Sequence, residues 1–200
     1  MKYNPDNERI KRKYFVFMKE AKRLSEQSID GIAKAIKRFE EYNKFRSFKA
    51  FHYEQAVGFK KHLKKQGSVQ TGNELSKATL NSTMRHLKAF FQWLALQSGY
   101  KSRINYSDAE YFNLSEKEVR VATAKREKSF PTIDQIVHVI NTMPTETVLD
   151  RRNRCLLAFT LATGARDGAI ASLKLKHIDL TTGSVFQDAR DVKTKFSKTF

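Results

Sequence analysis

Cysteine and proline are scarce in this sequence of 200 residues. Cys155 is the only cysteine, and the chain contains three prolines and eight glycines. A single cysteine excludes disulfides within the chain and a cysteine-based zinc site, and it fits a reducing compartment. The low proline and glycine content, together with 40% hydrophobic and 12% aromatic residues, favours a folded, helix-rich protein over a disordered one.

Patterns for a leader, a membrane span or a metal site are also missing. The first residues, from Met1 to Asp6, lack an apolar signal region, and no apolar run reaches the length of a bilayer crossing. There is no Walker A motif and no convincing carboxylate cluster for two metal ions. The histidines have no metal-like spacing, so structural or surface roles are expected for His52, His62, His86, His138 and His177. We therefore expect a soluble, cytoplasmic protein with no membrane partner and no metal.

Basic residues are in large excess. The chain has 38 Lys and Arg against 21 Asp and Glu, which gives a net charge of +17. The excess is greatest in residues 1–65, with 18 basic and 8 acidic side chains. A field of this size indicates a polyanionic partner, because each neutralised phosphate releases counterions. Nucleic acid is the first candidate; a membrane surface and simple solubility are the alternatives.

The first 65 residues are expected to form three amphipathic helices. One begins at Pro5 and repeats apolar residues at steps of four and three as far as Leu24. Another begins after Ser28 as N-cap and reaches Phe39. A third spans residues 53–65, and its outer face carries a basic patch made of Lys60, Lys61, Lys64 and Lys65. Residues 66–74 are polar with two glycines, so they are expected to form a loop.

The clearest helix begins after Ser76, a natural N-cap, and is expected to end near Ser98. Leu75 and Leu80 occupy the two positions of a hydrophobic staple. One face is apolar, and the opposite face carries Lys77, Asn81, Arg85, Lys88 and Gln92. Amide and basic side chains on such a face suit the major groove of DNA. The predicted DNA-binding residues are therefore Lys77, Thr79, Asn81, Arg85 and Lys88 here, with Lys60, Lys61 and Lys64 before them; an ordinary solvated face is the alternative.

The second half of the chain has a different pattern. Residues 99–131 lose helical periodicity and are expected to link two domains, with a short helix around residues 115–122. Thr132 and Gln135 form a capping box, and another helix is expected from Val148 to Thr163. Because that apolar helix stops at Gly164 and restarts two residues later, Arg166 is expected on a sharp corner. A short helix over residues 169–173 and strands at 184–187 and 192–196 complete the prediction.

Two stretches resemble a known family. Residues 161–179, which read LATGARDGAIASLKLKHID, look like the first catalytic-arginine motif of the tyrosine recombinases, the phage-integrase-type site-specific recombinases. Residues 75–93 are similar to the last main helix of that family's core-binding domain. The resemblance covers the chain from about residue 10 onward. One departure is that the family usually has an acidic residue where this chain has Ala169; Asp167 is a possible substitute.

The resemblance implies a mainly α fold with two domains. Residues 1–100 would form a helical, SAM-like core-binding domain that binds DNA, residues 101–131 the interdomain linker, and residues 132–200 the N-terminal part of an α+β catalytic domain with the start of a small β-sheet. It also implies a catalytic role for Arg166 and for Lys195, with Lys193 as the register alternative. The partners would be double-stranded DNA and, in the full-length protein, three further copies in a homo-tetramer. No cofactor is expected, because a phosphotyrosine intermediate conserves the bond energy.

Two elements of the family's active site are missing. No histidine has Arg three places later, and all seven tyrosines, the last being Tyr111, precede Arg166. We therefore expect a truncated N-terminal portion of a recombinase that does not cleave DNA by itself. One alternative is a non-catalytic DNA-binding module that acts as a regulator or competitor; another is a structural protein whose charge is incidental.

Overall fold

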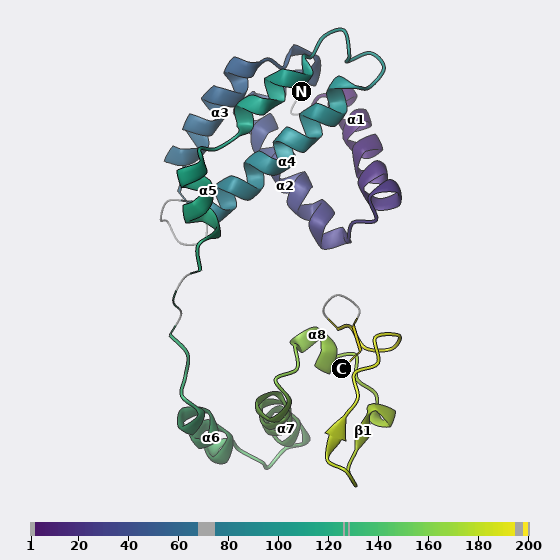
Figure 1. The fold of residues 1–200 in the computed structure, drawn as a ribbon, viewed down its shortest axis with the longest axis vertical. Coiled ribbons are helices and arrows are strands. Elements are labelled where there is room, and N and C mark those ends of the chain that lie inside the picture. Colours follow the sequence, from purple (N-terminus) through teal and green to yellow (C-terminus); the bar gives the residue numbers. More distant parts are fainter. Residues whose placement is uncertain (1–2, 68–74, 126, 128, 195–197, 200) are drawn as a thin grey trace. The chain divides into compact units, whose positions relative to one another are not determined.

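The computed structural model describes residues 3–67, 75–125, 127, 129–194 and 198–199. The fold is mainly α, as predicted, with one small antiparallel sheet in the described C-terminal part (Figure 1). The chain divides into two compact units, Met1–Arg126 and Glu127–Phe200. Within the described ranges, no helix has the length and apolar character that crossing a bilayer would require.

The first two helices begin at side-chain caps. Helix α1 (Pro5–Val16) starts behind Asn4, whose side chain accepts from the next turn, and it continues into a π-helical turn, η1 (Phe17–Ala21). The predicted stripe ends early, because the chain leaves the helix after this turn and Leu24 is exposed. Helix α2 (Glu26–Tyr42) is capped by Ser25 rather than by Ser28. The expected start was wrong by one turn, since Ser25 Oγ accepts a hydrogen bond from the Ser28 amide.

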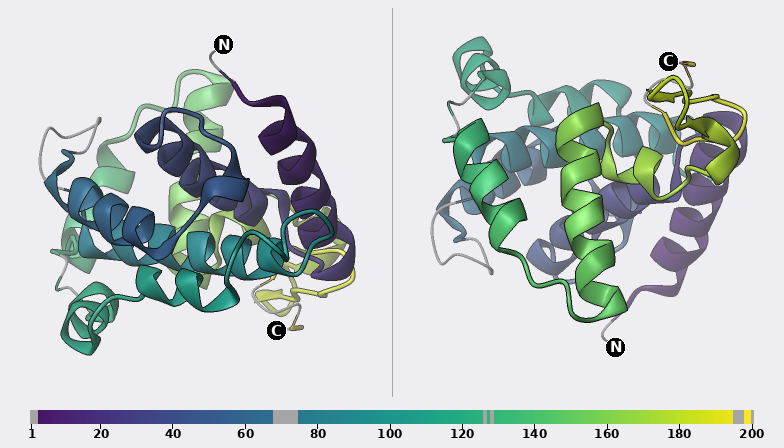
Figure 2. Two further views of the ribbon diagram at one scale, coloured as in Figure 1. Left: turned by 90° about the horizontal axis from the view of Figure 1, so that it is seen from above. Right: turned by 90° about the horizontal axis from the view of Figure 1, so that it is seen from below.

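Helix α4 (Lys77–Ala95) is central to the first unit, and Figures 1 and 2 show the other helices of this unit gathered around it. Ser76 caps it as predicted, and the predicted apolar stripe is buried. It packs against α2, against α3 (Tyr53–Lys65), and through Phe90 and Trp93 against Tyr14 of α1. The core is strongly aromatic, and its largest fully buried rings are Tyr14, Phe39, Phe48, Phe59, Phe90, Phe91 and Phe112.

Much of the expected linker packs against the first unit. The 3₁₀ helix η3 (Tyr106–Phe112) contacts both α3 and α4, and helix α5 (Glu116–Thr123) contacts α4. Ala109 and Phe112 are fully buried. Residues three apart lie on the same side of a 3₁₀ helix, so this pair faces the core although the segment lacks the periodicity of an α-helix. The short helix expected around residues 115–122 is present as α5.

The second unit contains short helices and a small hairpin. Helix α6 (Ile133–Thr142) begins with the predicted Thr132–Gln135 capping box, and α7 (Val148–Thr163) follows behind a Thr147 cap. The helix expected at residues 169–173 lies instead at Asp167–Ile170 (α8), and η4 (Leu175–His177) follows it. Strand β1 (Ile178–Asp179), which was not predicted, pairs with β2 (Ser184–Val185). Residues 192–194 form no strand, and residues 195 and 196 of that predicted strand lie outside the described residues.

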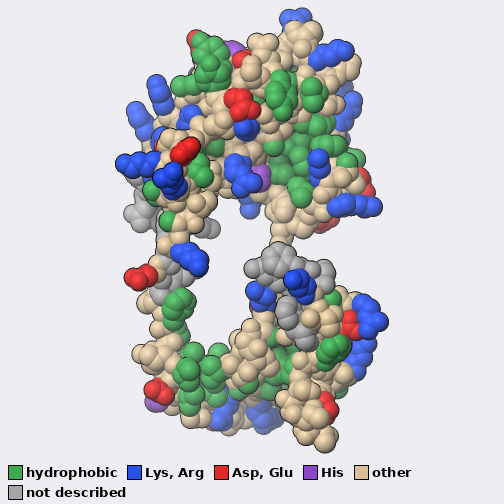
Figure 3. Space-filling model, in the orientation of Figure 1, with side chains coloured by type: hydrophobic (Ala, Val, Ile, Leu, Met, Phe, Trp, Pro, Cys, Tyr) green, Lys and Arg blue, Asp and Glu red, His purple; other side chains and the backbone are tan. Residues whose placement is uncertain are grey.

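The second unit leaves large apolar side chains exposed on its surface. Among its described helices, α6 and α7 contain no buried residue. Ile133 and Val148 are 69% and 73% exposed, and Figure 3 shows hydrophobic side chains gathered over α6. The buried side chains of this unit instead lie around α8 and the loop after it: Ala165, Ala169, His177 and Val192.

Candidate phosphate-binding site and nucleic-acid interface

The predicted corner at Arg166 is present. Helix α7 ends at Gly164, which has φ 60° and donates from its amide to Thr160 O at 2.9 Å. The Ala165 amide then donates to Thr163 Oγ1, and Ala165 itself is buried. Arg166 follows in an extended conformation as the N-cap of α8. Its backbone is therefore held from both sides by a left-handed turn and a helix start.

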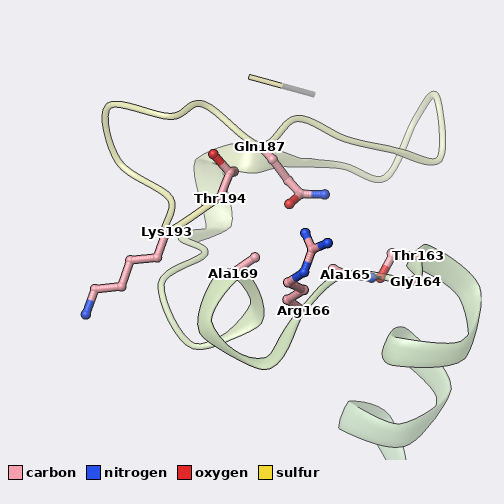
Figure 4. Close-up of a pocket in the computed structure, with 8 residues that line it drawn as sticks. All are labelled: Thr163, Gly164, Ala165, Arg166, Ala169, Gln187, Lys193 and Thr194. Atoms are coloured by element: carbon pink, nitrogen blue, oxygen red, sulfur yellow. Dashed lines mark hydrogen bonds between the residues drawn. The ribbon is translucent and has the colours of Figure 1, made fainter. Parts of the chain in front are cut away.

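The Arg166 side chain points into a pocket of about 300 Å³ on the second unit (Figure 4). Gln187 and Thr194 lie across this pocket, and the Gln187 amide points toward the guanidinium. Arg166 is exposed, and among the residues that the structure describes its side chain makes no hydrogen bond or ion pair. A guanidinium with all its donors available can bind a phosphate through two parallel hydrogen bonds.

The surroundings of Arg166 contain no carboxylate partner within the described ranges. Ala169, at the position where the resembled family carries an acid, is 2% exposed and lines the same pocket. Asp167 makes no ion pair with Arg166 among the described residues, and its Oδ1 accepts from the neighbouring Gly168 amide at 2.8 Å. The charge of Arg166 is therefore not neutralised by the described part of the chain.

Of the two candidate catalytic lysines, only Lys193 can be located. Lys195 lies outside the described residues, so its assignment stays a prediction. Lys193 borders the Arg166 pocket, but its side chain points away from the guanidinium (Figure 4). Its backbone nitrogen donates to Ser172 Oγ at 2.8 Å. The backbone at residue 193 is thus tied to the turn that follows α8.

A second anchor holds the same segment. The Asp191 carboxylate lies 3.0 Å from Lys174 Nζ, 2.5 Å from Lys176 Nζ and 3.4 Å from the buried His177 ring. Hydrogen bonds from Lys176 and Lys174 hold the pKa of Asp191 well below its usual range. Sequence reasoning missed Gln187, Thr194, Ser172 and Asp191, because no local pattern marks a polar residue that meets a partner across the fold.

The predicted DNA-binding residues of the first unit differ in their surroundings. Lys61, Lys77 and Arg85 are exposed, whereas Thr79 is part of the α4 cap, its hydroxyl lying 2.9 Å from Ser76 Oγ. Asn81, Arg85 and Lys88 line a groove of about 410 Å³, whose other wall is formed by the segment from Phe112 to Thr123. The lining combines apolar side chains, such as Met84 and Leu114, with basic and amide-bearing ones.

Three of the predicted lysines bond to the segment 110–118. Lys60 Nζ donates to the backbone oxygens of Tyr111 and Asn113 at 2.8 and 2.7 Å, and burial lowers its pKa. Lys88 Nζ lies 2.7 Å from Glu110 Oε2, and Lys64 pairs with Glu118. Sequence reasoning did not anticipate these contacts, because residues 101–131 were expected to be a linker.

No group of three or more His, Cys, Asp and Glu side chains in the described ranges is arranged to hold a metal ion. The candidate sites considered from the sequence are the Arg166 pocket and the basic surface of α3 and α4. Both carry donors for anions, which is the chemistry of phosphate recognition.

Comparison with known proteins relates the chain to the tyrosine recombinases. No protein-family model matches it, and no solved structure matches it. It is similar to three curated proteins named "Tyrosine recombinase XerC", two from strains of Lactobacillus delbrueckii subsp. bulgaricus and one from Lactobacillus leichmannii. Each is 25% identical over 131 residues, which is 64% of this chain and 40% of the relative. These matches support the family relationship that the Arg166 motif indicates.

Proposed function

We propose that this chain is part of a tyrosine-type site-specific recombinase that breaks and rejoins double-stranded DNA through a phosphotyrosine intermediate. The observation that carries the proposal is Arg166, held on a rigid corner with an exposed guanidinium and no acidic partner among the described residues. The relatives named XerC point to the same class. The domain assignment follows from it, with the first unit binding DNA and the second carrying part of the active site.

In this proposal Arg166 binds a non-bridging oxygen of the scissile phosphate. Its fixed positive charge would stabilise the charge that develops when a tyrosine attacks phosphorus and the 5′ oxygen leaves. A lysine, Lys195 or Lys193, would assist from the segment after β2. Neither the nucleophilic tyrosine nor the His-x-x-Arg cluster is found after Arg166 in this sequence, so the 200-residue chain alone is expected to bind DNA without cleaving it.

The first unit would supply most of the binding. Its α4 residues Lys77, Asn81 and Arg85 would lie along the major groove, and the basic residues of α3 would contact phosphates. The strong net charge supports a large electrostatic contribution. A homo-tetramer on two DNA sites is the assembly that we propose for the whole recombinase.

The test is the binding of the chain to a labelled DNA duplex across a salt series. The variant Lys77→Ala/Arg85→Ala/Lys88→Ala should bind more weakly, and the log–log salt slope should fall by about 0.9 for each phosphate that the variant no longer neutralises. The control is Arg9→Ala/Arg12→Ala/Lys13→Ala, which removes the same charge from exposed positions of α1. Equal reductions of affinity in the two variants would mean that net charge alone, and not the α4 surface, determines DNA binding. Absence of binding at low salt would overturn the proposal.

A second candidate function is a DNA-binding module without chemistry. It is favoured by Ala169, since the acid that the family usually places there is absent and Asp167 makes no ion pair with Arg166 among the described residues. The two functions differ at Arg166. The chain is extended with a C-terminal segment that carries the family's His-x-x-Arg and nucleophilic tyrosine. If it is a recombinase, the extended chain should cleave DNA and its Arg166→Ala variant should not. A pure binding module would show no cleavage with Arg166 or with Ala at this position.

A further inference from the structure

Glu118 of α5 forms an ion pair with one of the lysines of the proposed DNA-binding surface. It pairs with Lys64 of α3, and this pairing lowers the pKa of Glu118 to about 2, with smaller contributions from the Ser115 amide and hydroxyl. The side chains of Lys64 and Glu118 are 39% and 25% exposed. A carboxylate and a DNA phosphate would compete for the same ammonium group.

Helix α5 also lies beside α4 (Figure 1). Val119 and Thr123 form the wall of the groove opposite Asn81 and Arg85. An α-helix inserted into the major groove nearly fills its width. With α5 in place, α4 therefore presents a broader and partly neutralised surface to DNA.

The attachment of α5 differs from that of the segment before it, because α5 packs against α4 without any fully buried side chain of its own. Phe112 is fully buried and anchors η3 in the core, whereas α5, which is described over its whole length, contains no buried residue. Val119 and Val121 are 36% and 50% exposed. An exposed ion pair adds little stability, so α5 can leave α4 without disrupting the aromatic core.

We propose that α5 is an autoinhibitory element that competes with DNA for the surface formed by α3 and α4, and that DNA binding displaces it. This inference rests on the proposed function. Glu118 acts as the competing anion, and Lys64 becomes available to a phosphate only when α5 moves. The contacts of Lys60 and Lys88 with residues 110–113 involve the segment before α5 and are not part of this displacement.

The test compares two variants of the 200-residue chain that remove the same charge from the same helix. Glu118→Gln removes the charge facing Lys64, and Gln still serves at the third position of the capping box that Ser115 and Glu118 form. Glu116→Gln is the control, because Glu116 contacts Arg120 of its own helix. Glu118→Gln should raise duplex affinity about twofold to fivefold, the range set by an exposed ion pair, and Glu116→Gln should raise it less.

The salt dependence gives a second readout. Because DNA displaces α5 in the wild type as well, Lys64 reaches a phosphate in both chains, so the log–log slope of affinity against salt should be the same in the wild type and in Glu118→Gln. Lys64→Met should make the slope shallower by about 0.9 in both. Equal gains in the two Gln variants, or a slope that Lys64→Met leaves unchanged, would overturn the inference. The proposed function is tested separately with the wild-type chain. If the wild type shows no salt-dependent binding to the duplex, α3 and α4 do not form a DNA-binding surface.

Discussion

Ser172 Oγ accepts a hydrogen bond from the backbone nitrogen of Lys193 at 2.8 Å, and it also lies 2.8 Å from the Gly168 carbonyl oxygen. One hydroxyl therefore joins α8, which begins behind Arg166, to the segment that borders the Arg166 pocket. This bond and the contacts of Asp191 together tie the segment that contains Lys193 and Thr194 to the chain after α8.

Replacing Ser172 with Ala should loosen that segment. A hydrogen bond of this kind contributes about 1 kcal/mol, so amide exchange at Lys193 should become about fivefold faster, while Ser172→Thr should keep it slow. Ser184→Ala, which removes an exposed hydroxyl of β2, is the control. Hydrogen exchange followed by NMR makes the comparison, and unchanged protection in Ser172→Ala would show that the segment is held by the Asp191 contacts alone.

Gly164 should be the glycine of the Arg166 corner that tolerates substitution least. Its φ of 60° is costly for any residue with a Cβ, whereas Gly168 is not among the positive-φ residues, and at both sites an added Cβ would meet no atom within 4 Å. Gly164→Ala should lower the free energy of unfolding by ~1 kcal/mol through backbone strain. Gly168→Ala in α8 should be neutral or slightly stabilising. Urea unfolding distinguishes the two, and equal effects would contradict the conformational argument.

Local chemistry explains which parts of the fold were predictable. The caps at Ser76 and Thr132 and the stop at Gly164 depend on a few neighbouring residues, and all three were located correctly. The predicted start of α2 was wrong because Ser25 and Ser28 are both good caps, and the local sequence does not distinguish between them. The buried η3 was missed because its 3₁₀ spacing does not produce the period of an α-helix.

The candidate site was predictable only where one residue carried the signal. Arg166 stands out in sequence because an apolar helix and a glycine precede it. Gln187 and Thr194 reach the same pocket from distant segments, and nothing in their neighbourhoods marks them. For the same reason the lysines of α3 and α4 appeared free in sequence, although three of them bond to residues 110–118 in the folded chain.

The first unit should be more stable when the hydroxyl group of Tyr14 is removed. The side chain is fully buried against Phe90 and Trp93, and its Oη has no hydrogen-bond partner among the described residues. Burial raises the pKa of Tyr14. Tyr14→Phe keeps the ring contacts and removes the unpaired polar atom, so the free energy of unfolding should rise by ~1 kcal/mol.

The alkaline pH dependence provides a second check on Tyr14. Because its folded pKa lies above the usual 10.0, the wild type should lose stability as the pH rises above that value, where the unfolded tyrosine ionises. The Phe variant should lack this contribution. A variant less stable than the wild type at neutral pH would show that the hydroxyl has a partner, such as a buried water.

Glu40 connects α2 to α1 through a buried polar cluster. Its carboxylate is 1% exposed and accepts from Lys11 Nζ at 2.6 Å and from Asn7 Nδ2 at 3.2 Å. Asn7 in turn accepts from the Phe48 amide and donates to Arg46 O. Removing one member of such a cluster leaves buried groups without partners, which costs ~3 kcal/mol. We expect Glu40→Ala to lower the free energy of unfolding by about that amount.

The neighbouring Glu41 is the matched control, because its carboxylate is exposed and lies 3.9 Å from Lys37 on the same helix. Glu41→Ala should cost less than ~0.5 kcal/mol. Burial acts to lower the pKa of Lys11, but hydrogen bonds and charge from Glu40 and Glu8 outweigh it and raise that pKa above its usual 10.5. This contribution is therefore complete below pH 10.5 and is lost as the pH rises through the higher folded pKa. The stability difference between wild type and Glu40→Ala, measured by urea unfolding, should shrink there, and a constant difference would mean that the Asn7 contact alone carries the effect.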